Sequence, residues 1–212
     1  TGISLAVTLL SNVQGWFTGR GDAAPADPDS QLMWRYRQSG SADLLARLMR
    51  NTGDDLYHFL LTQTDAAFAE DLYQSVWLRV MERRHQYEPG SAKFKTWLFT
   101  LGRHLMIDEL RRQKRWQTTD LDNADTDPAS LAELHTQPLE STIAQDNLHQ
   151  HFDRLLLGLP FAQREAFVLQ QEGFSLKDIS DITGIGQETI KSRLRFARQT
   201  LQQQLEAHYG PA

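Results

Sequence analysis

Basic side chains are predicted on one face of the last long helical segment of the chain. Lys191, Ser192 and Arg195 point away from an apolar stripe whose members recur every three or four residues. Cations on the open face of a helix can reach phosphates and base edges in the major groove of duplex DNA. The alternative for this segment alone is a helical hairpin with a solvated basic face. The apolar stripe consists of Ile190, Leu194, Ala197, Leu201 and Leu205.

The residues before that helix complete a helix-turn-helix pattern. Ser175, with Asp178 three residues later, is typical of a capping box at the start of a helix. Ile179 and Ile182 give this helix an apolar side, and Gly184 favours the left-handed turn that ends it. We therefore predict a unit that reads duplex DNA near the C-terminus.

A second segment, residues 83–116, interleaves aromatic side chains with cations. Aromatic rings stack on unpaired bases while Lys and Arg follow the phosphates, so this pattern favours single-stranded nucleic acid. The alternative is that Trp97, Leu101 and Leu105 pack in a core, and that the ending RRQKR only complements the helix dipole. The aromatic members are Tyr87, Phe94, Trp97, Phe99 and Trp116.

Charge is distributed in blocks along the 212 residues, although the net charge is only −5. Residues 93–116 hold seven basic and two acidic side chains, whereas residues 117–147 hold seven acidic side chains and no Lys or Arg. Such blocks indicate local partners. The absence of cysteine excludes disulfides and thiolate metal sites. The apolar run at residues 3–10 is too short to cross a membrane and lacks the basic flank of a signal peptide, so we expect no stable membrane insertion.

Hydrophobic periodicity predicts an all-α protein with two helical domains joined by a flexible acidic linker, the C-terminal domain containing the helix-turn-helix. A flexible linker also predicts that the domains change their relative placement on binding a partner. The expected parts are a flexible extension over 1–28, an N-terminal domain over 29–116, the linker over 117–142 and a C-terminal domain over 143–212. The first expected helix begins at Asp29 or Ser30 and ends at 37, and the second begins at 42 and is interrupted at 51–53. The third runs from a cap at Asp65 to 86. Further helices are expected over 94–114, over 143–157 and from Pro160 to 171.

Three segments in this order resemble the extracytoplasmic-function group of bacterial RNA polymerase sigma factors. They are AEDLYQSVWLRVMER, FKTWLFTLGRHLMIDELRR and LPFAQREAFVLQQEGFSLKDISDITGIGQETIKSRLRFARQTL, preceded by LMWRYRQSGSADLLARL. The resemblance covers about residues 30–207 and includes the acidic linker. It implies a dissociable, non-enzymatic initiation subunit without a cofactor. That subunit would work in the cytoplasm, with RNA polymerase core, promoter DNA and an anti-sigma factor as its partners.

The resemblance also implies three sets of contact residues. Core polymerase would be bound by Asp71, Leu72, Gln74 and Trp77. The melted promoter element would be read by Lys93, Phe94, Lys95, Trp97, Arg103, His104, Asp108, Arg111 and Arg112. The upstream duplex element would be read by Lys191, Ser192, Arg193, Arg195, Phe196 and Arg198.

The chain departs from the family pattern within each set. Ser75 stands where the family usually has an acid, and His104 replaces the usual Asn. Phe196 stands where Arg is usual, which predicts either a lost phosphate contact or an apolar contact with a thymine methyl group. The alternative role of Arg193 and Arg198 is pairing with acids on neighbouring helices.

Two other functions compete with this interpretation. An ordinary helix-turn-helix repressor would bind duplex DNA without polymerase, usually as a dimer, and would leave residues 93–116 without a role. A small helical hydrolase could place a metal between His104 and Asp108, but no third ligand, nucleophile motif or phosphate loop accompanies them. His149 and His151, two residues apart, would lie on different helix faces. We therefore expect no catalytic and no metal-binding residues.

Overall fold

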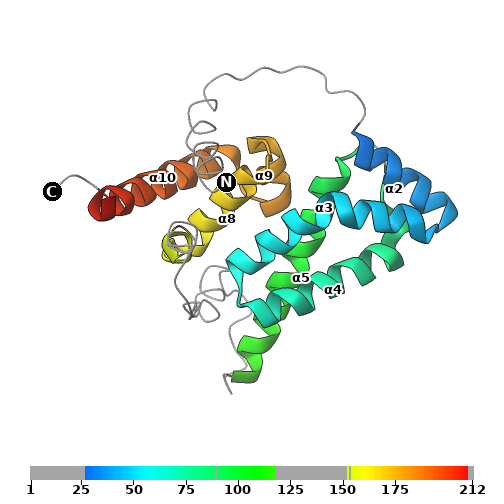
Figure 1. Cartoon of the computed structure of the whole chain (residues 1–212), viewed down its shortest axis with the longest axis horizontal. Coiled ribbons are helices and arrows are strands. Elements are labelled where there is room, and N and C mark those ends of the chain that lie inside the picture. Colours follow the sequence, from blue (N-terminus) through cyan, green and yellow to red (C-terminus); the bar gives the residue numbers. More distant parts are fainter. Residues whose placement is uncertain (1–26, 89, 118–151, 153, 210–212) are drawn as a thin grey trace.

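The computed structural model describes residues 27–88, 90–117, 152 and 154–209. All regular elements in these ranges are helices, which confirms the predicted all-α class. Residues 1–26 of the predicted extension and 118–142 of the predicted linker lie outside the described residues. We call α2 (Pro28–Ser39), α3 (Ala42–Gln63), α4 (Ala66–Arg83) and α5 (Phe94–Gln117) the N-terminal unit, and α8 (Phe161–Gln171), α9 (Leu176–Thr183) and α10 (Gln187–Tyr209) the C-terminal unit (Figure 1).

Helix α2 begins earlier than the sequence predicts. Its N-cap is Asp27, whose carboxylate accepts hydrogen bonds from the Ser30 backbone N–H at 3.3 Å and from the Ser30 hydroxyl at 2.6 Å. Neither Asp29 nor Ser30 is the cap, because Pro28 already occupies the first turn, where its missing N–H leaves no bond unmade. The helix ends at Gly40, whose φ of 65° lies in the left-handed region.

Helix α3 is continuous, and the predicted interruption at residues 51–53 is wrong. Thr52 turns its hydroxyl inward and donates to the Leu48 carbonyl at 2.9 Å. Gly53 lies where α4 approaches closely, since a Cβ atom there would be 2.6 Å from the Tyr73 hydroxyl oxygen. The glycine therefore allows close packing between two helices and does not break the first one.

Helix α4 follows the sequence prediction in its start and its buried face. The Asp65 carboxylate caps it by accepting a hydrogen bond from the Phe68 backbone N–H at 2.9 Å. The α-helix ends at Arg83, and the chain continues as the short 3-10 helix η1 (Arg84–Gln86). A turn with Gly90 at φ 94° then leads into α5. The predicted stripe of α4 lies in the core: Phe68, Leu72, Val76 and Val80.

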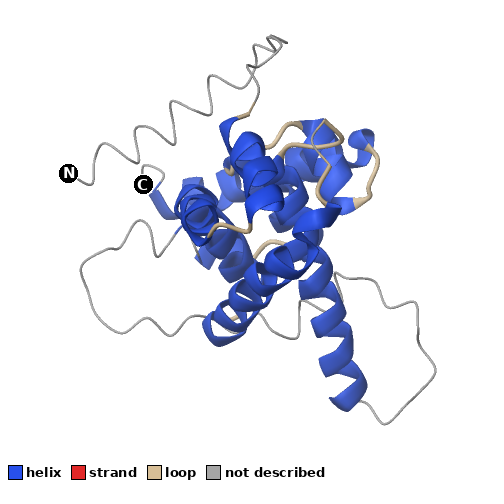
Figure 2. Cartoon of the chain, turned by 90° about the vertical axis from the view of Figure 1, so that its right-hand side faces the viewer, coloured by secondary structure: helices blue, strands red, loops and turns tan. Residues whose placement is uncertain are grey.

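The two units pack directly against each other. Helix α5 lies against α9, and α3 lies against α8. Arg164 of α8, which is 2% exposed, donates to the Leu157 and Leu159 carbonyls at 3.0 and 3.1 Å and to the side-chain oxygen of Gln63 in α3 at 3.4 Å. The C-terminal end of α5 projects at the bottom of both views (Figure 1 and Figure 2). Among the described helices, none is long and apolar enough to cross a membrane.

Candidate nucleic-acid interface

The helix-turn-helix is built as the sequence predicts. The Ser175 hydroxyl accepts a hydrogen bond from the Asp178 backbone N–H, and the Asp178 carboxylate accepts one from the Ser175 backbone N–H, both at 3.1 Å. These bonds form the capping box of α9, and Gly184 ends that helix with a φ of 71°. Ile182 of α9 and Ile190 of α10 are at most 1% exposed, so their contacts fix the two helices together.

The outer face of α10 carries the predicted duplex-reading side chains. Lys191, Ser192 and Arg195 are exposed. Lys191 Nζ lies 2.7 Å from Glu188 Oε1, in an exposed pair that a phosphate can replace at little cost. The Arg195 guanidinium lies over the Phe196 ring, 4.9 Å from its centroid, and that ring is 47% exposed. This face therefore offers cations and an apolar surface together.

Arg193 and Arg198 lie at the edge of this face and are partly buried. Arg198 donates to the side-chain oxygen of Gln170 in α8 at 2.5 Å, and burial lowers its pKa. Arg198 is thus tied to a neighbouring helix through an amide side chain, whereas the alternative role expects an acid.

Aromatic side chains pack together at the start of α5. The Phe94 ring is fully buried, with its centroid 6.1 Å from those of both Tyr87 and Trp97. The Phe94 backbone N–H donates to the Ser30 hydroxyl at 2.9 Å. Burial also raises the pKa of the Tyr87 phenol. The Phe94 ring therefore belongs to the core in this structure and offers no surface for the predicted contact with the melted element. Trp97 is partly buried, and Lys93 is exposed.

Lys95 faces the C-terminal unit. Its Nζ lies 2.5 Å from Asp55 Oδ2 of α3 and 2.7 Å from the backbone carbonyl of Glu172. The same ammonium lies 5.7 Å from the Phe99 ring centroid and 5.3 Å from that of Phe174. A cation predicted to follow a DNA phosphate is therefore bound by oxygens of the protein itself.

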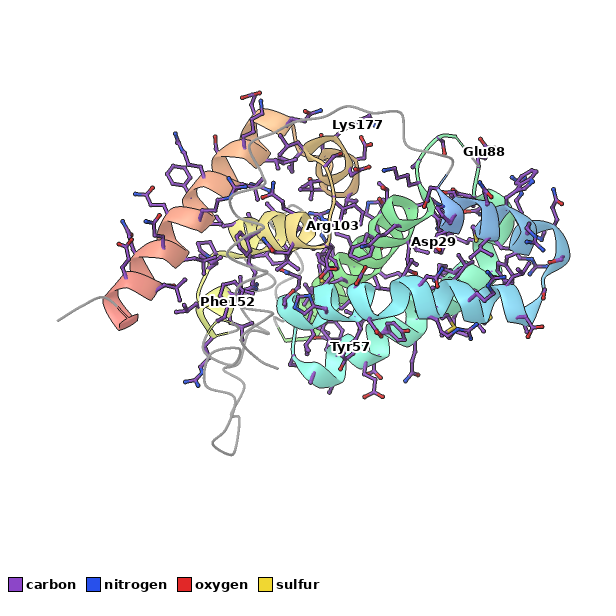
Figure 3. The ribbon with its side chains drawn as sticks, turned by 45° about the horizontal axis from the view of Figure 1, so that its top comes forward. Asp29, Tyr57, Glu88, Arg103, Phe152 and Lys177 are labelled. Atoms are coloured by element: carbon purple, nitrogen blue, oxygen red, sulfur yellow. The ribbon has the colours of Figure 1, made fainter. Side chains whose placement is uncertain are left out.

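Arg103 lies at the boundary between α5 and α8 (Figure 3). Its Nε lies 2.7 Å from Glu165 Oε1, and its Nη2 lies 3.4 Å from Glu165 Oε2. The Arg103 side chain is 11% exposed and that of Glu165 only 1%. Sequence reasoning missed Glu165, although a signal exists: it falls four residues after Phe161 and three before Val168, on the apolar stripe of α8. A carboxylate in such a position needs a partner.

The later part of α5 faces outward. His104, Asp108 and Arg111 are exposed. Arg112 Nε donates to Glu109 at 2.8 Å, and the hydrogen bonds from Arg112 lower the pKa of that carboxyl group. Side chains at residues 114–117 lie outside the described part, and the predicted ring at position 116 with them.

Helix α4 presents an exposed ridge that carries both polar and apolar side chains. Asp71 and Gln74, predicted to bind polymerase, are exposed. Leu72 and Trp77 are each 4% exposed, so they lie beneath the ridge and have little surface for direct contact. Leu78, which the sequence prediction did not include, is 56% exposed.

Comparison with known proteins agrees with this architecture. Residues 48–116 match the family described as Sigma-70 region 2, and residues 149–201 match Sigma-70, region 4. The chain is 33% identical over 181 residues to the ECF RNA polymerase sigma factor SigL of Mycobacterium tuberculosis, covering 80% of this chain and 96% of SigL. It belongs to the extracytoplasmic-function (ECF) sigma factors. The ECF sigma factor SigM of Bacillus subtilis is 31% identical to this sigma factor over 150 residues, covering 70% of this chain and 86% of SigM.

Solved structures agree with the fold of this sigma factor. The sigma factor RpoE, solved in complex with the anti-sigma factor NepR from Bartonella quintana, is 28% identical with a TM-score of 0.58, covering 76% of this chain and 96% of RpoE. CnrH, solved with the cytosolic domain of CnrY, has the same TM-score at 20% identity, covering 85% of this chain and 99% of CnrH.

The family and function predicted from the sequence are confirmed. This chain is an alternative sigma factor, which directs RNA polymerase to promoters. Sigma factors are transcription initiation factors rather than enzymes. The contact residues assigned to each partner, and the domain boundaries, stay predictions.

Proposed function

We propose that this sigma factor divides promoter recognition among three helices. Helix α4 docks on core RNA polymerase, α5 reads the melted promoter element and α10 reads the upstream duplex element. The proposal rests on the observation that each helix presents an exposed surface of different chemistry. Helix α4 exposes a ridge with Leu78, α5 exposes cations, and α10 exposes cations beside Phe196. The chain acts in the cytoplasm beside the polymerase and catalyses no reaction of its own.

The docking surface is the ridge of α4, defined by Asp71, Gln74, Ser75 and Leu78. These positions are spaced by three, one and three residues, so they share one helix face. Leu78, which is 56% exposed, gives this face apolar area beside a carboxylate for contact with a protein partner. Because an acid is missing at Ser75, we assign more of the binding energy to Leu78.

The melted-element surface is the outer side of α5 together with its first turn. Arg111 and His104 are open to a strand, and Lys93 lies exposed just before the helix. Arg103 joins this surface only after its contact with the C-terminal unit breaks, and Lys95 must leave both Glu172 and Asp55 of α3. Extruding a base costs unstacking energy of a few kcal/mol, which contacts with these cations offset.

The duplex-reading surface is the face of α10 that carries Lys191, Ser192 and Arg195. Phe196, partly exposed beside Arg195, supplies an apolar contact for a thymine methyl group. Helix α9 supports this face through the capping box of Ser175 and Asp178.

We also assign to this sigma factor a protein inhibitor of the anti-sigma class. Both solved relatives were obtained with a bound protein, described for RpoE as an anti-sigma factor. Such an inhibitor would be detected experimentally because it competes with core polymerase for binding to the chain.

The test combines purified chain, bacterial core polymerase and a library of promoter fragments. The expected result is binding to core with selective initiation, and Leu78→Ala or Asp71→Ala should weaken core binding. Gln203→Ala, an exposed change late in α10, is the matched control and should behave like the unaltered chain. Specific duplex binding without any binding to core would contradict the proposal and favour the repressor.

A further inference from the structure

Two cations assigned to the melted strand, Lys95 and Arg103, bind the C-terminal unit, and a third, the exposed Lys93, lies near it. Arg103 is held by both oxygens of Glu165, and Lys95 donates to the Glu172 carbonyl at 2.7 Å. Lys93 interacts electrostatically with Asp178 of α9. The basic side of α5 therefore meets carboxylate and carbonyl oxygens that belong to the same chain.

Carboxylates and phosphates compete for the same cations. The fork of a guanidinium donates hydrogen bonds to two oxygens of either anion in the same geometry. Because Glu165 is 1% exposed and uses both of its oxygens on Arg103, a DNA phosphate cannot reach that fork while the units remain packed.

We infer that the C-terminal unit masks the strand-reading side of α5 in the free chain, with Glu165 and Asp178 taking the places of DNA phosphates, while the ridge of α4 and the outer face of α10 stay open. This inference rests on the proposed function, because it uses the surfaces assigned there. Opening of the mask is then a separate step between docking on polymerase and holding the melted strand.

Further contacts hold the mask in place. The Phe174 ring packs edge-on against Phe99 of α5, with centroids 4.7 Å apart. The Thr96 hydroxyl donates to the Asp178 carboxylate at 3.1 Å, so the Asp178 side chain both caps α9 and binds α5. His58 of α3 lies 2.7 Å from Glu172, at the turn between α8 and α9. These contacts add apolar packing and two further polar contacts to the closed arrangement.

The other two working surfaces remain accessible in the closed arrangement. Asp71 and Leu78 of α4 are exposed, as are Lys191 and Arg195 of α10. The closed chain can therefore meet polymerase and duplex DNA first. It holds a single strand less tightly because Lys95 and Arg103 are occupied, which reduces its binding to unpaired nucleic acid away from a promoter.

The first test locks the closed arrangement. The chain has no cysteine, so His58→Cys with Glu172→Cys introduces a unique pair that a short reducible bis-thiol-reactive linker can join. Neither residue is assigned to DNA or polymerase. We expect the linked chain to bind core normally but to initiate at least about tenfold less often, with reduction of the linker restoring initiation. The single His58→Cys variant, treated with the same linker, is the control. Equal initiation by linked and reduced chains would overturn the inference.

The second test removes the charge of Glu165, whose carboxylate occupies the place of a DNA phosphate on Arg103. Glu165→Gln keeps the size of the side chain and removes its charge. The free variant should bind a labelled, mixed-sequence single-stranded DNA oligonucleotide roughly fivefold to tenfold more tightly than the unaltered chain. Glu82→Gln, at an exposed acid of α4, changes the net charge equally and is the matched control. No gain in Glu165→Gln, or the same gain in both variants, would contradict masking.

The proposed function and the masking of α5 can fail separately. If the unaltered chain does not initiate with core polymerase, the proposed function fails. If it initiates normally while the linked chain also initiates normally, only the mask is wrong.

Discussion

Arg103 and Glu165 lie 62 residues apart in the sequence and form a two-point ion pair across the boundary between the two helical units. Both side chains are largely removed from water, at 11% and 1% exposure. A buried ion pair adds little stability compared with apolar packing, but removing one partner leaves an uncompensated charge. This pair therefore makes the relative placement of α5 and α8 specific.

Glu165→Ala is expected to lower the free energy of unfolding by up to about 3 kcal/mol, measured by chemical denaturation. The loss is limited because separation of the units returns Arg103 to water. Glu82→Ala, which removes an exposed pair with Arg79, should change stability by no more than about 0.5 kcal/mol. Equal effects of the two substitutions would argue against a buried role for Glu165.

Acid should weaken the contact between α9 and α5 through Asp178. Burial pushes the pKa of this carboxyl group upward, but hydrogen bonds from Ser175 and Thr96, with the charge of Lys93, outweigh burial and hold the pKa below its ordinary value of 3.8. A depressed carboxyl pKa contributes stability above the unfolded value, and that contribution is lost as pH falls through the folded value. Below pH 3.8 the unfolding free energy of the unaltered chain should therefore fall more steeply than that of Asp178→Asn. Parallel curves in denaturation experiments over this range would contradict the assignment.

Gly53→Ala is expected to destabilise the N-terminal unit, although alanine is the better helix former by about 0.5–1 kcal/mol. The added Cβ would lie 2.6 Å from the Tyr73 hydroxyl oxygen, so either the packed Tyr73 side chain or one of the helices must shift. In a Tyr73→Phe background that oxygen is absent, and the same substitution should become neutral or stabilising. Thermal unfolding of the four chains gives the coupling directly, and additive effects would exclude the close approach as the cause.

Lys191→Ala and Arg195→Ala should each weaken promoter-specific initiation by about 1–3 kcal/mol if the side chain reads a base. The reason is that both side chains lie on the open face of α10, away from its buried stripe. Transcription from a fixed promoter and binding to core polymerase are measured in parallel. Core binding should be unchanged, and loss of core binding in either variant would show that α10 is not dedicated to DNA.

Local features were predictable from the sequence because they depend on neighbouring residues. The capping box of Ser175 and Asp178, the cap at Asp65 and the left-handed Gly184 each involve contacts within one helical turn. The apolar stripes of α4 and α10 were predictable for the same reason, since a period of 3.6 residues selects one helix face. Gly53 was misinterpreted because its role depends on Tyr73, which approaches from another helix.

The sequence by itself determined that the chain is all-helical, that a helix-turn-helix lies near its C-terminus and that two segments carry cations suited to nucleic acid. Only the tertiary structure decided which of those cations are exposed and which lie against other segments of the chain. Lys95 and Lys191 are the same residue type on predicted helix faces, yet one lies against Glu172 and Asp55 while the other is exposed. The physical reason is that periodicity says which face of a helix is apolar, whereas the partner of a polar face depends on how distant segments pack.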